Sequence, residues 1–176
     1  MGSGSAMCFA ERSGSIRTNS EVEEGSLPAS SDPSSEIRSY FADRFGISEA
    51  VLDRMHFAFR GDDVWAATVA VPEGIRTARP VGLHAARRTP HGWRPTGVFL
   101  ICLGDAVAAS RVEICDVRHL REFLQGRPSE SCAPTGYVAV AFRGDVLGCG
   151  LVDRGRLRVQ IPTGRRRELL EALRLA

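Results

Sequence analysis

The residues of this chain that most clearly indicate a binding function are arginines close to its C-terminal end. Seven arginines and five glycines fall within residues 142–169, FRGDVLGCGLVDRGRLRVQIPTGRRREL. A guanidinium group carries a fixed charge and a planar fork of donors that fits phosphate oxygens. The pattern therefore predicts phosphate binding by Arg143, Arg154, Arg156, Arg158, Arg165, Arg166 and Arg167.

Two groups of these arginines have a defined local geometry. Arg156 and Arg158 alternate with Leu157 and Val159, so a strand would direct both guanidinium groups to one face. Residues 165–167 fall in the first turn of an expected helix, where free backbone N–H groups also attract anions. Cations at that position oppose the helix dipole, so a run of solvated charge is the alternative interpretation.

A second basic cluster lies near the middle of the chain. It comprises Arg87, Arg88 and Arg94 around Trp93. An exposed tryptophan among arginines could stack on a nucleobase, whereas a buried one would close the core. We expect the core role for Trp93 and count the three arginines among the candidate nucleic-acid contacts.

Gly148 and Gly150 flank Cys149 within an expected strand. Glycine at such a place can mark a bulge or a bend at a barrel corner. It can equally allow another backbone or a nucleic acid strand to approach closely. Both interpretations stay open from the sequence, so the two glycines are also candidate binding residues.

Catalytic and metal-binding patterns are missing from the sequence. It contains no glycine-rich dinucleotide motif, no P-loop, no H-E-x-x-H and no nucleophile elbow. The five cysteines form no C-x-x-C pair, and no histidine follows Cys149. The sequence therefore predicts no catalytic residue, no metal site and no cofactor. Only His84, His91 and Asp105 are weak candidates for the alternative of a small hydrolase.

Charge is segregated along the 176 residues, and all 23 basic residues are arginines. Residues 1–35 contain 2 arginines and 5 acidic residues, residues 36–74 contain 4 and 7, and residues 75–176 contain 17 and 9. The net charges of these three segments are −3, −3 and +8, so the N-terminal part of the sequence is acidic and the C-terminal part is basic. Such asymmetry predicts a polyanionic partner.

Neither a signal peptide nor a membrane span is expected. The start, MGSGSAMCFAERSG, lacks a basic region followed by an apolar one, and the apolar runs are short. The odd number of cysteines agrees with a reducing compartment. We expect a cytoplasmic protein without membrane contact.

The elements that would position the arginines are helices and short strands. Ser34 or Ser35 would cap a helix that ends at Gly46, and Ser48 would cap a short second helix. A hairpin is expected from strands 56–59 and 64–71, and residues 73–96 form a basic, turn-rich connection. Further strands are expected at 97–104, 106–115, 136–142, 146–152 and 156–162, with helices at 116–126 and 164–176.

The sequence therefore predicts an α+β fold in three parts. Residues 1–33, rich in Ser, Gly and Glu, are expected to form a disordered tail. Residues 34–74 would form a small α/β segment that is too short to bury a core alone. It would pack on a mixed β-barrel with flanking helices at residues 75–176.

Residues 136–166 resemble the PUA-type RNA-binding domain appended to Nop/Sun-type RNA cytosine-C5 methyltransferases. The matching positions are Gly136, Tyr137, Val138, Val140, Leu147, Gly148, Gly150, Arg156, Leu157, Pro162, Gly164 and Arg166. The segment from IRSYFADRFGI to LDRMHFAFRGDDVWAAT is similar to the pre-PUA segment of ribosome-biogenesis and RNA-modification proteins. The chain departs from the family at three places. The family has a basic residue at the position of Leu151, Lys-Asn at Arg158-Val159 and Lys at Thr163.

The resemblance implies binding of structured RNA, such as tRNA or rRNA, mainly through shape and phosphate contacts. The methyltransferase half has no counterpart, since a cofactor-binding glycine-rich turn and a Pro-Cys catalytic loop are missing. We therefore expect a non-enzymatic RNA-binding protein in rRNA or tRNA maturation, with a separate RNA methyltransferase or ribosome-assembly factor as candidate partner. A protein-interaction module is the remaining alternative.

Deletion of residues 1–33 is expected to leave the melting temperature almost unchanged, because a segment without apolar periodicity buries little surface. Differential scanning fluorimetry of the full and truncated chains measures this. A loss of several degrees would show that the segment docks on the folded domain.

Overall fold

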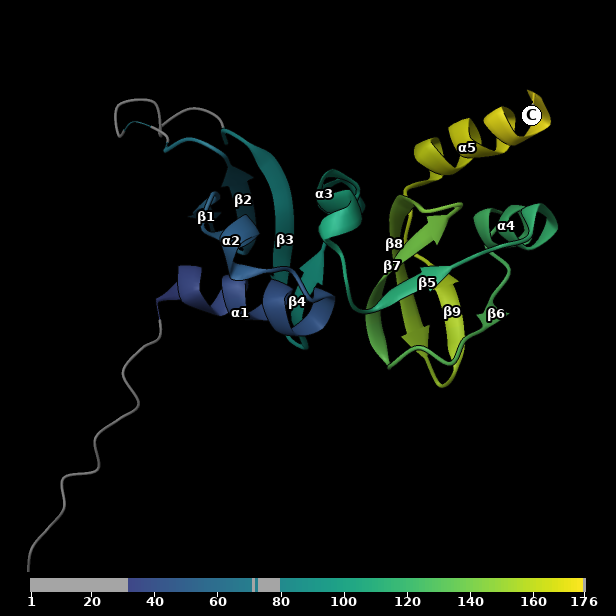
Figure 1. Ribbon diagram of the computed structural model, residues 1–176, viewed down its shortest axis with the longest axis horizontal. Coiled ribbons are helices and arrows are strands. Elements are labelled where there is room, and N and C mark those ends of the chain that lie inside the picture. Colours follow the sequence, from purple (N-terminus) through teal and green to yellow (C-terminus); the bar gives the residue numbers. More distant parts are fainter. Residues whose placement is uncertain (1–31, 71, 73–79, 176) are drawn as a thin grey trace, which may run out of the picture. The chain divides into compact units, whose positions relative to one another are not determined.

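Two β-sheets and the helices that cover them form the described part of the chain (Figure 1). The computed structural model describes residues 32–70, 72 and 80–175, which belong to one unit, Ser31–Ala176. The expected tail at residues 1–33 lies outside the described residues, apart from Asp32 and Pro33.

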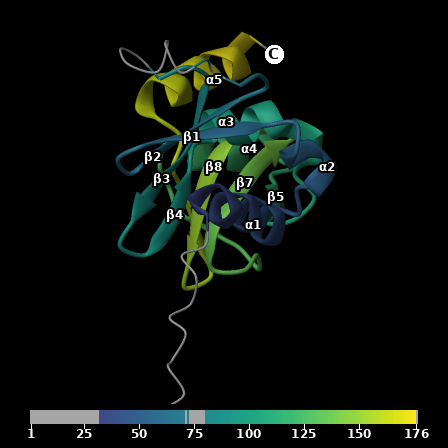
Figure 2. The same cartoon turned by 90° about the vertical axis from the view of Figure 1, so that its left-hand side faces the viewer.

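The first sheet is antiparallel, with the strand order β1-β2-β3-β4, and Figure 2 shows it from the side of β1. Its strands are β1 (His56–Arg60), β2 (Asp63–Ala67), β3 (Leu83–Thr89) and β4 (Gly92–Pro95). β3 and β4 lie within the turn-rich connection expected at residues 73–96 and replace much of its second half. Because β2 pairs with β3, the sheet crosses the domain boundary expected between residues 74 and 75.

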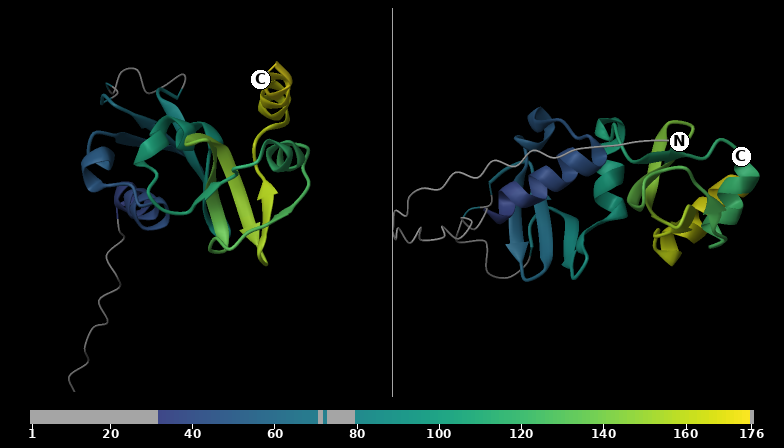
Figure 3. Two further views of the ribbon diagram at one scale, coloured as in Figure 1. Left: turned by 45° about the vertical axis from the view of Figure 1, so that its right-hand side comes forward. Right: turned by 90° about the horizontal axis from the view of Figure 1, so that it is seen from below.

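The second sheet has five strands in the order β5-β7-β8-β9-β6 and curls into a half-barrel (Figure 3). They are β5 (Arg111–Glu113), β6 (Ser129–Glu130), β7 (Gly136–Phe142), β8 (Asp145–Asp153) and β9 (Arg156–Val159). β5 is parallel to β7, and the other neighbours are antiparallel. The expected α+β class, with a curled mixed sheet and flanking helices, is confirmed.

α1 (Pro33–Phe45) begins slightly earlier than the sequence predicted. Its N-cap is Asp32, whose side chain accepts a hydrogen bond from the N–H of Ser34 at 3.2 Å, so neither Ser34 nor Ser35 is the cap. Gly46, with φ of 64°, ends the helix as expected. A truncation that tests the tail should keep Asp32, because loss of an N-cap costs about 1 kcal/mol.

A first hydrophobic core lies between the four-stranded sheet, α1, α2 (Glu49–Leu52) and α3 (Gly97–Leu103). Its largest fully buried side chains are Ile37, Phe41, Phe45, Leu52, Val64, Phe99 and Leu100. Ala139, Ala141 and Cys149 of the five-stranded sheet belong to the same core. The two sheets are therefore not independent layers.

The prediction of a strand at residues 97–104 is wrong, because residues 97–103 form α3. Thr96 caps the helix by accepting a hydrogen bond from the N–H of Phe99 at 3.2 Å. Val98 and Ile101 are 55% and 37% exposed, on the side opposite the buried residues. Every residue from 98 to 103 is apolar, so the sequence lacks the polar positions that distinguish a helical from a strand period.

The strand expected at 106–115 is mostly wrong as well. The short 3-10 helix η2 (Gly104–Ala106) follows α3, and only β5 is a strand. Val107 is buried in the first core, and Ser110 has a positive φ of 47° that interrupts an extended chain. β5 is an edge strand that pairs with β7.

A second core lies on the other face of the five-stranded sheet, under α4 (Val117–Leu124) and α5 (Thr163–Leu175) (Figure 3). Its buried residues are Ile114, Leu120, Phe123, Leu124, Val138, Val140, Val152, Leu157 and Ile161. Asp116 caps α4 as expected by accepting from the N–H groups of Arg118 and His119. Within the described ranges, no helix is long and apolar enough to cross a membrane.

Gly148 and Gly150 are buried in the curled part of β8. A Cβ on Gly150 would lie 2.7 Å from Leu157 Cδ1 and 2.8 Å from Val140 Cγ2, and one on Gly148 would lie 2.9 Å from Ile161 Cγ1. The pairing of β7 with β8 shifts register beside Gly148. The structure thus places Gly148 beside a bulge and both glycines in close packing, with neither exposed for a nucleic-acid contact.

Replacement of Gly150 by Ala is expected to lower the free energy of unfolding by about 1–3 kcal/mol, since the added methyl overpacks the second core. Gly164→Ala is the matched control, because a Cβ there meets no atom within 4 Å and lies in α5. The control should gain about 0.5–1 kcal/mol from helix propensity. Urea denaturation measures both, and equal stabilities would contradict the packing role of Gly150.

Candidate functional site

The outer face of the four-stranded sheet, opposite the first core, carries a line of charged residues. Arg60, Asp63, Arg87 and Arg94 are successive cross-strand partners from β1 to β4. Arg87 donates to Asp63 through Nε at 2.7 Å and through Nη2 at 2.9 Å. These hydrogen bonds hold the pKa of the Asp63 carboxyl below its usual range. Arg87 is therefore ordered by a carboxylate, and Arg94 is its neighbour on β4.

Arg94 connects this face to the five-stranded sheet. Its Nη2 donates to Gln160 Oε1 at 3.2 Å. The backbone N–H of Gln160 donates to the carbonyl of Cys149 and so continues the pairing of β9 with β8. A contact between residues 66 positions apart thus joins the two arginine clusters that the sequence showed separately.

The exposed side of β9 continues this line of charge. Arg156 and Arg158 alternate with the buried Leu157, so both share the side of Gln160. Arg154 lies in the turn between β8 and β9, next to Arg156. We call this set the arginine row: Arg87, Arg94, Arg158, Arg156 and Arg154.

The arginine row keeps net positive charge. Arg87 is paired with Asp63, and Arg158 Nη2 lies 3.6 Å from Asp153 Oδ2 with both groups exposed. Exposed pairs contribute only about 0–1 kcal/mol, so a phosphate can compete for the arginine. In the part of the chain that the structure describes, Arg94, Arg154 and Arg156 form no ion pair.

Arg143 and Arg88, both predicted contacts, lie apart from the row. Arg143 occupies the turn between β7 and β8, at the opposite end of the nine-residue β8 from Arg154, about 30 Å along the strand. Arg88 pairs with Glu36 of α1, and its guanidinium carbon lies 4.7 Å from the centre of the Trp93 ring. Arg88 therefore ties β3 to α1.

The three arginines of α5 differ from one another in their surroundings. Arg166 is half-buried, and it donates to the carbonyl of Leu124 at 3.3 Å and to Thr163 Oγ1 at 3.0 Å. Arg165 is exposed and pairs with Glu168 at 3.0 Å. The Arg167 side chain is exposed and makes no hydrogen bond or ion pair within the described ranges. Arg166 thus holds α5 to α4, and only its two neighbours are available to a ligand.

The two tryptophans lie on opposite faces of the four-stranded sheet. Trp93 is 9% exposed, belongs to the first core and donates through Nε1 to Glu36 Oε1 at 3.1 Å, which confirms its expected core role. Trp65 lies on the outer face and stacks on His84. Sequence reasoning missed Trp65, although its alternation with the buried Val64 and Ala66 would have indicated an outward side chain.

The weak hydrolase candidates belong to separate elements. His84 is on β3 and its Nε2 lies 3.1 Å from Asp63 Oδ1, His91 is in the β3–β4 turn, and Asp105 is in η2. Burial raises the pKa of the Cys149 thiol to about 12, which keeps it protonated and unreactive at neutral pH. Among the described residues, no three His, Cys, Asp or Glu side chains form a group that could hold a metal ion.

Comparison with protein families gives one match on this part of the chain. Residues 116–167 match the family model described as the methyltransferase RsmF PUA domain. The match runs from the cap of α4, through β6 to β9, to the first turn of α5. No significant match was found among curated proteins. The chain thus carries a PUA-like domain that resembles those of Sun/Nop-type methyltransferases.

Arg166→Gln is expected to lower the free energy of unfolding by about 1–2 kcal/mol, because it removes the hydrogen bond to the carbonyl of Leu124. Arg165→Gln and Arg167→Gln are matched controls in the same turn. Each should change stability by about 0.5 kcal/mol or less. Thermal and urea unfolding measure all three, and equal effects would refute the distinct role of Arg166.

Proposed function

We propose that this chain binds structured RNA through its PUA-like domain, with the arginine row as the phosphate-binding surface. The observation that carries the proposal is the match of residues 116–167 to a methyltransferase PUA domain, since β9 of this segment bears Arg156 and Arg158 on its exposed side. A PUA domain from an RNA methyltransferase family supports RNA as the partner.

The chemistry of the row supports the same partner. Guanidinium groups bind phosphate oxygens bidentately, and successive groups on one side of a strand are about 7 Å apart. Most contacts of such a surface would go to the RNA backbone and would position the RNA without reading its sequence. Recognition would then depend on the shape of a folded RNA, such as tRNA or rRNA.

We further infer a non-catalytic role in rRNA or tRNA maturation. The matched family places this type of domain beside a methyltransferase, and the matched segment here is the binding module. The chain would bring a separate RNA-modifying enzyme, such as a methyltransferase, or a ribosome-assembly factor to its RNA. This role is a proposal that rests on the domain type.

Binding of a tRNA transcript should weaken strongly as salt rises. Each phosphate contact adds about −0.7 to −0.9 to the slope of log K against log salt, so the five arginines of the row predict a slope of about −3.5 to −4.5. The variant with Arg94, Arg156 and Arg158 all changed to Gln should lose about ten-fold or more in affinity and have a slope shallower by two to three contacts.

The matched control changes Arg54, Arg118 and Arg174 to Gln, since these exposed arginines lie on other elements and carry the same total charge. Fluorescence anisotropy at several salt concentrations measures the affinity of both variants. Equal losses would show attraction by net charge alone. A row variant that folds and binds like the original protein would overturn the proposed surface.

A further inference from the structure

The outer face of the four-stranded sheet carries an aromatic stack beside the arginine row. Trp65 and His84 are cross-strand partners, and their ring centres lie 5.0 Å apart with planes 22° from parallel. His84 Nε2 lies 3.1 Å from Asp63 Oδ1, the carboxylate that also binds Arg87. Asp63 therefore connects the stack to the first arginine of the row.

The opposite side of Trp65 faces a much smaller neighbour. Its cross-strand partner on β1 is Ala58, an exposed residue whose methyl group is too small to cover an indole ring. Both residues line a hollow of about 520 Å³ that extends along β1. His56, Arg60, Ala67 and Val81 also line it, and the hollow continues around β1 to Phe57, Phe59 and the Arg38 side chain of α1.

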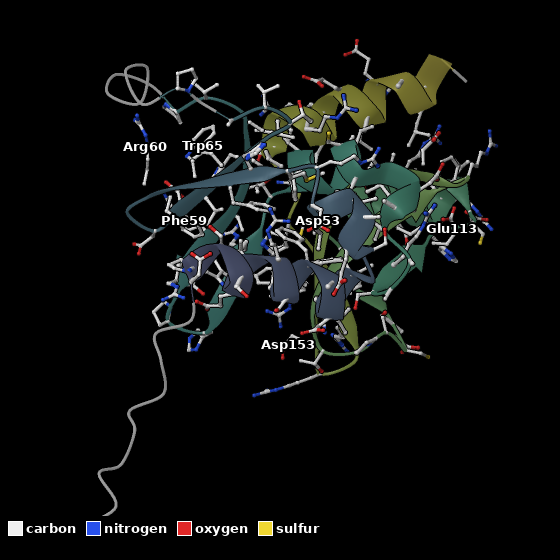
Figure 4. The ribbon with its side chains drawn as sticks, turned by 60° about the vertical axis from the view of Figure 1, so that its left-hand side comes forward. Asp53, Phe59, Arg60, Trp65, Glu113 and Asp153 are labelled. Atoms are coloured by element: carbon white, nitrogen blue, oxygen red, sulfur yellow. The ribbon has the colours of Figure 1, made fainter. Side chains whose placement is uncertain are left out.

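Figure 4 shows Arg60 and Trp65 close together at the β1–β2 hairpin. Arg60 is the cross-strand partner of Asp63, so it belongs to the same outer face as Trp65. The hollow therefore combines an aromatic ring, whose one side is supported by His84, with a guanidinium group on the same face.

This combination fits one chemical class of ligand. A flat heteroaromatic ring could occupy the space above Ala58 and stack on Trp65, and Arg60 on the same face favours an attached phosphate. The volume of the whole hollow, of which this face forms one part, lies within the range of small-molecule sites. A base paired within a duplex cannot present its face to such a ring, so the nucleobase must be unpaired.

We propose that Trp65, supported by His84, is a stacking site for one unpaired nucleobase of an RNA whose phosphates lie on the arginine row. The inference rests on the proposed RNA-binding function and adds a preference for loops, bulges or single strands. Stacking is tolerant of sequence, because every base has a π-face. The site thus selects unpaired over paired RNA and does not select one base.

Ala58→Leu is the sharpest test, because it fills the space above Ala58 and leaves Trp65 and the arginines unchanged. The site predicts that affinity for a single-stranded RNA decamer falls about ten-fold, the size expected for one stacked base. Affinity for an RNA duplex of the same sequence should stay unchanged. Ala58→Ser is the matched control, since a small side chain leaves the space open, and it should bind both RNAs like the original protein.

Tryptophan fluorescence gives a second measurement. The chain has two tryptophans, and Trp93 is buried, so quenching by the decamer should come from Trp65. Trp65→Phe should abolish the quenching and keep part of the affinity, because phenylalanine still offers a ring. This variant keeps the site testable if Ala58→Leu fails to fold in a thermal melt.

The outcomes separate the two proposals. If Ala58→Leu and Trp65→Phe bind the decamer like the original protein while the row variant loses affinity, the stacking site is overturned and RNA binding stands. If the original protein binds neither RNA, both proposals are overturned. A selective loss of single-stranded binding in Ala58→Leu supports the stacking site.

Discussion

The close approach of α3 to β8 is the constraint on which the rest of this structure depends. A Cβ on Gly97 would lie 3.3 Å from the backbone nitrogen of Cys149 and 3.5 Å from Gly148 Cα. A larger side chain at Gly97 would require the helix or the strand to shift by a few tenths of an ångström. Because the helix stays close, Phe99 and Leu100 share one core with Cys149 and its neighbours from the second sheet.

That shared core determines which charged residues of the two sheets lie next to each other. β4 leads directly into α3, so the packing of α3 on β8 also sets the position of β4 relative to β9. Arg94 consequently reaches Gln160, and the outer face of one sheet continues onto the exposed side of the other. The proposed phosphate-binding surface is therefore a product of core packing, although all its residues lie outside the core.

Arginine has two different roles in this chain. Arg166 and Arg44 use their guanidinium groups to satisfy backbone carbonyls, of Leu124 and of Tyr137 respectively. Arg94 and Arg156 are exposed and keep their charge available. A chain whose basic residues are all arginine can thus use one side chain both as a structural donor and as a ligand for an anion.

By itself the sequence determined the elements that have a local signal. These are α1, with its apolar stripe and its end at Gly46, α4, with its apolar stripe and its cap Asp116, and the β7–β8–β9 meander with its turns. It also indicated the PUA-like domain and the concentration of arginine near its end. It could not identify α3, because an unbroken apolar run has no visible period. Only the tertiary structure decided that Arg94 joins Gln160, that Arg166 bonds to Leu124, and that Trp65 stacks on His84. The physical reason is that these contacts join residues tens of positions apart, and their energies depend on burial and geometry that no local pattern carries.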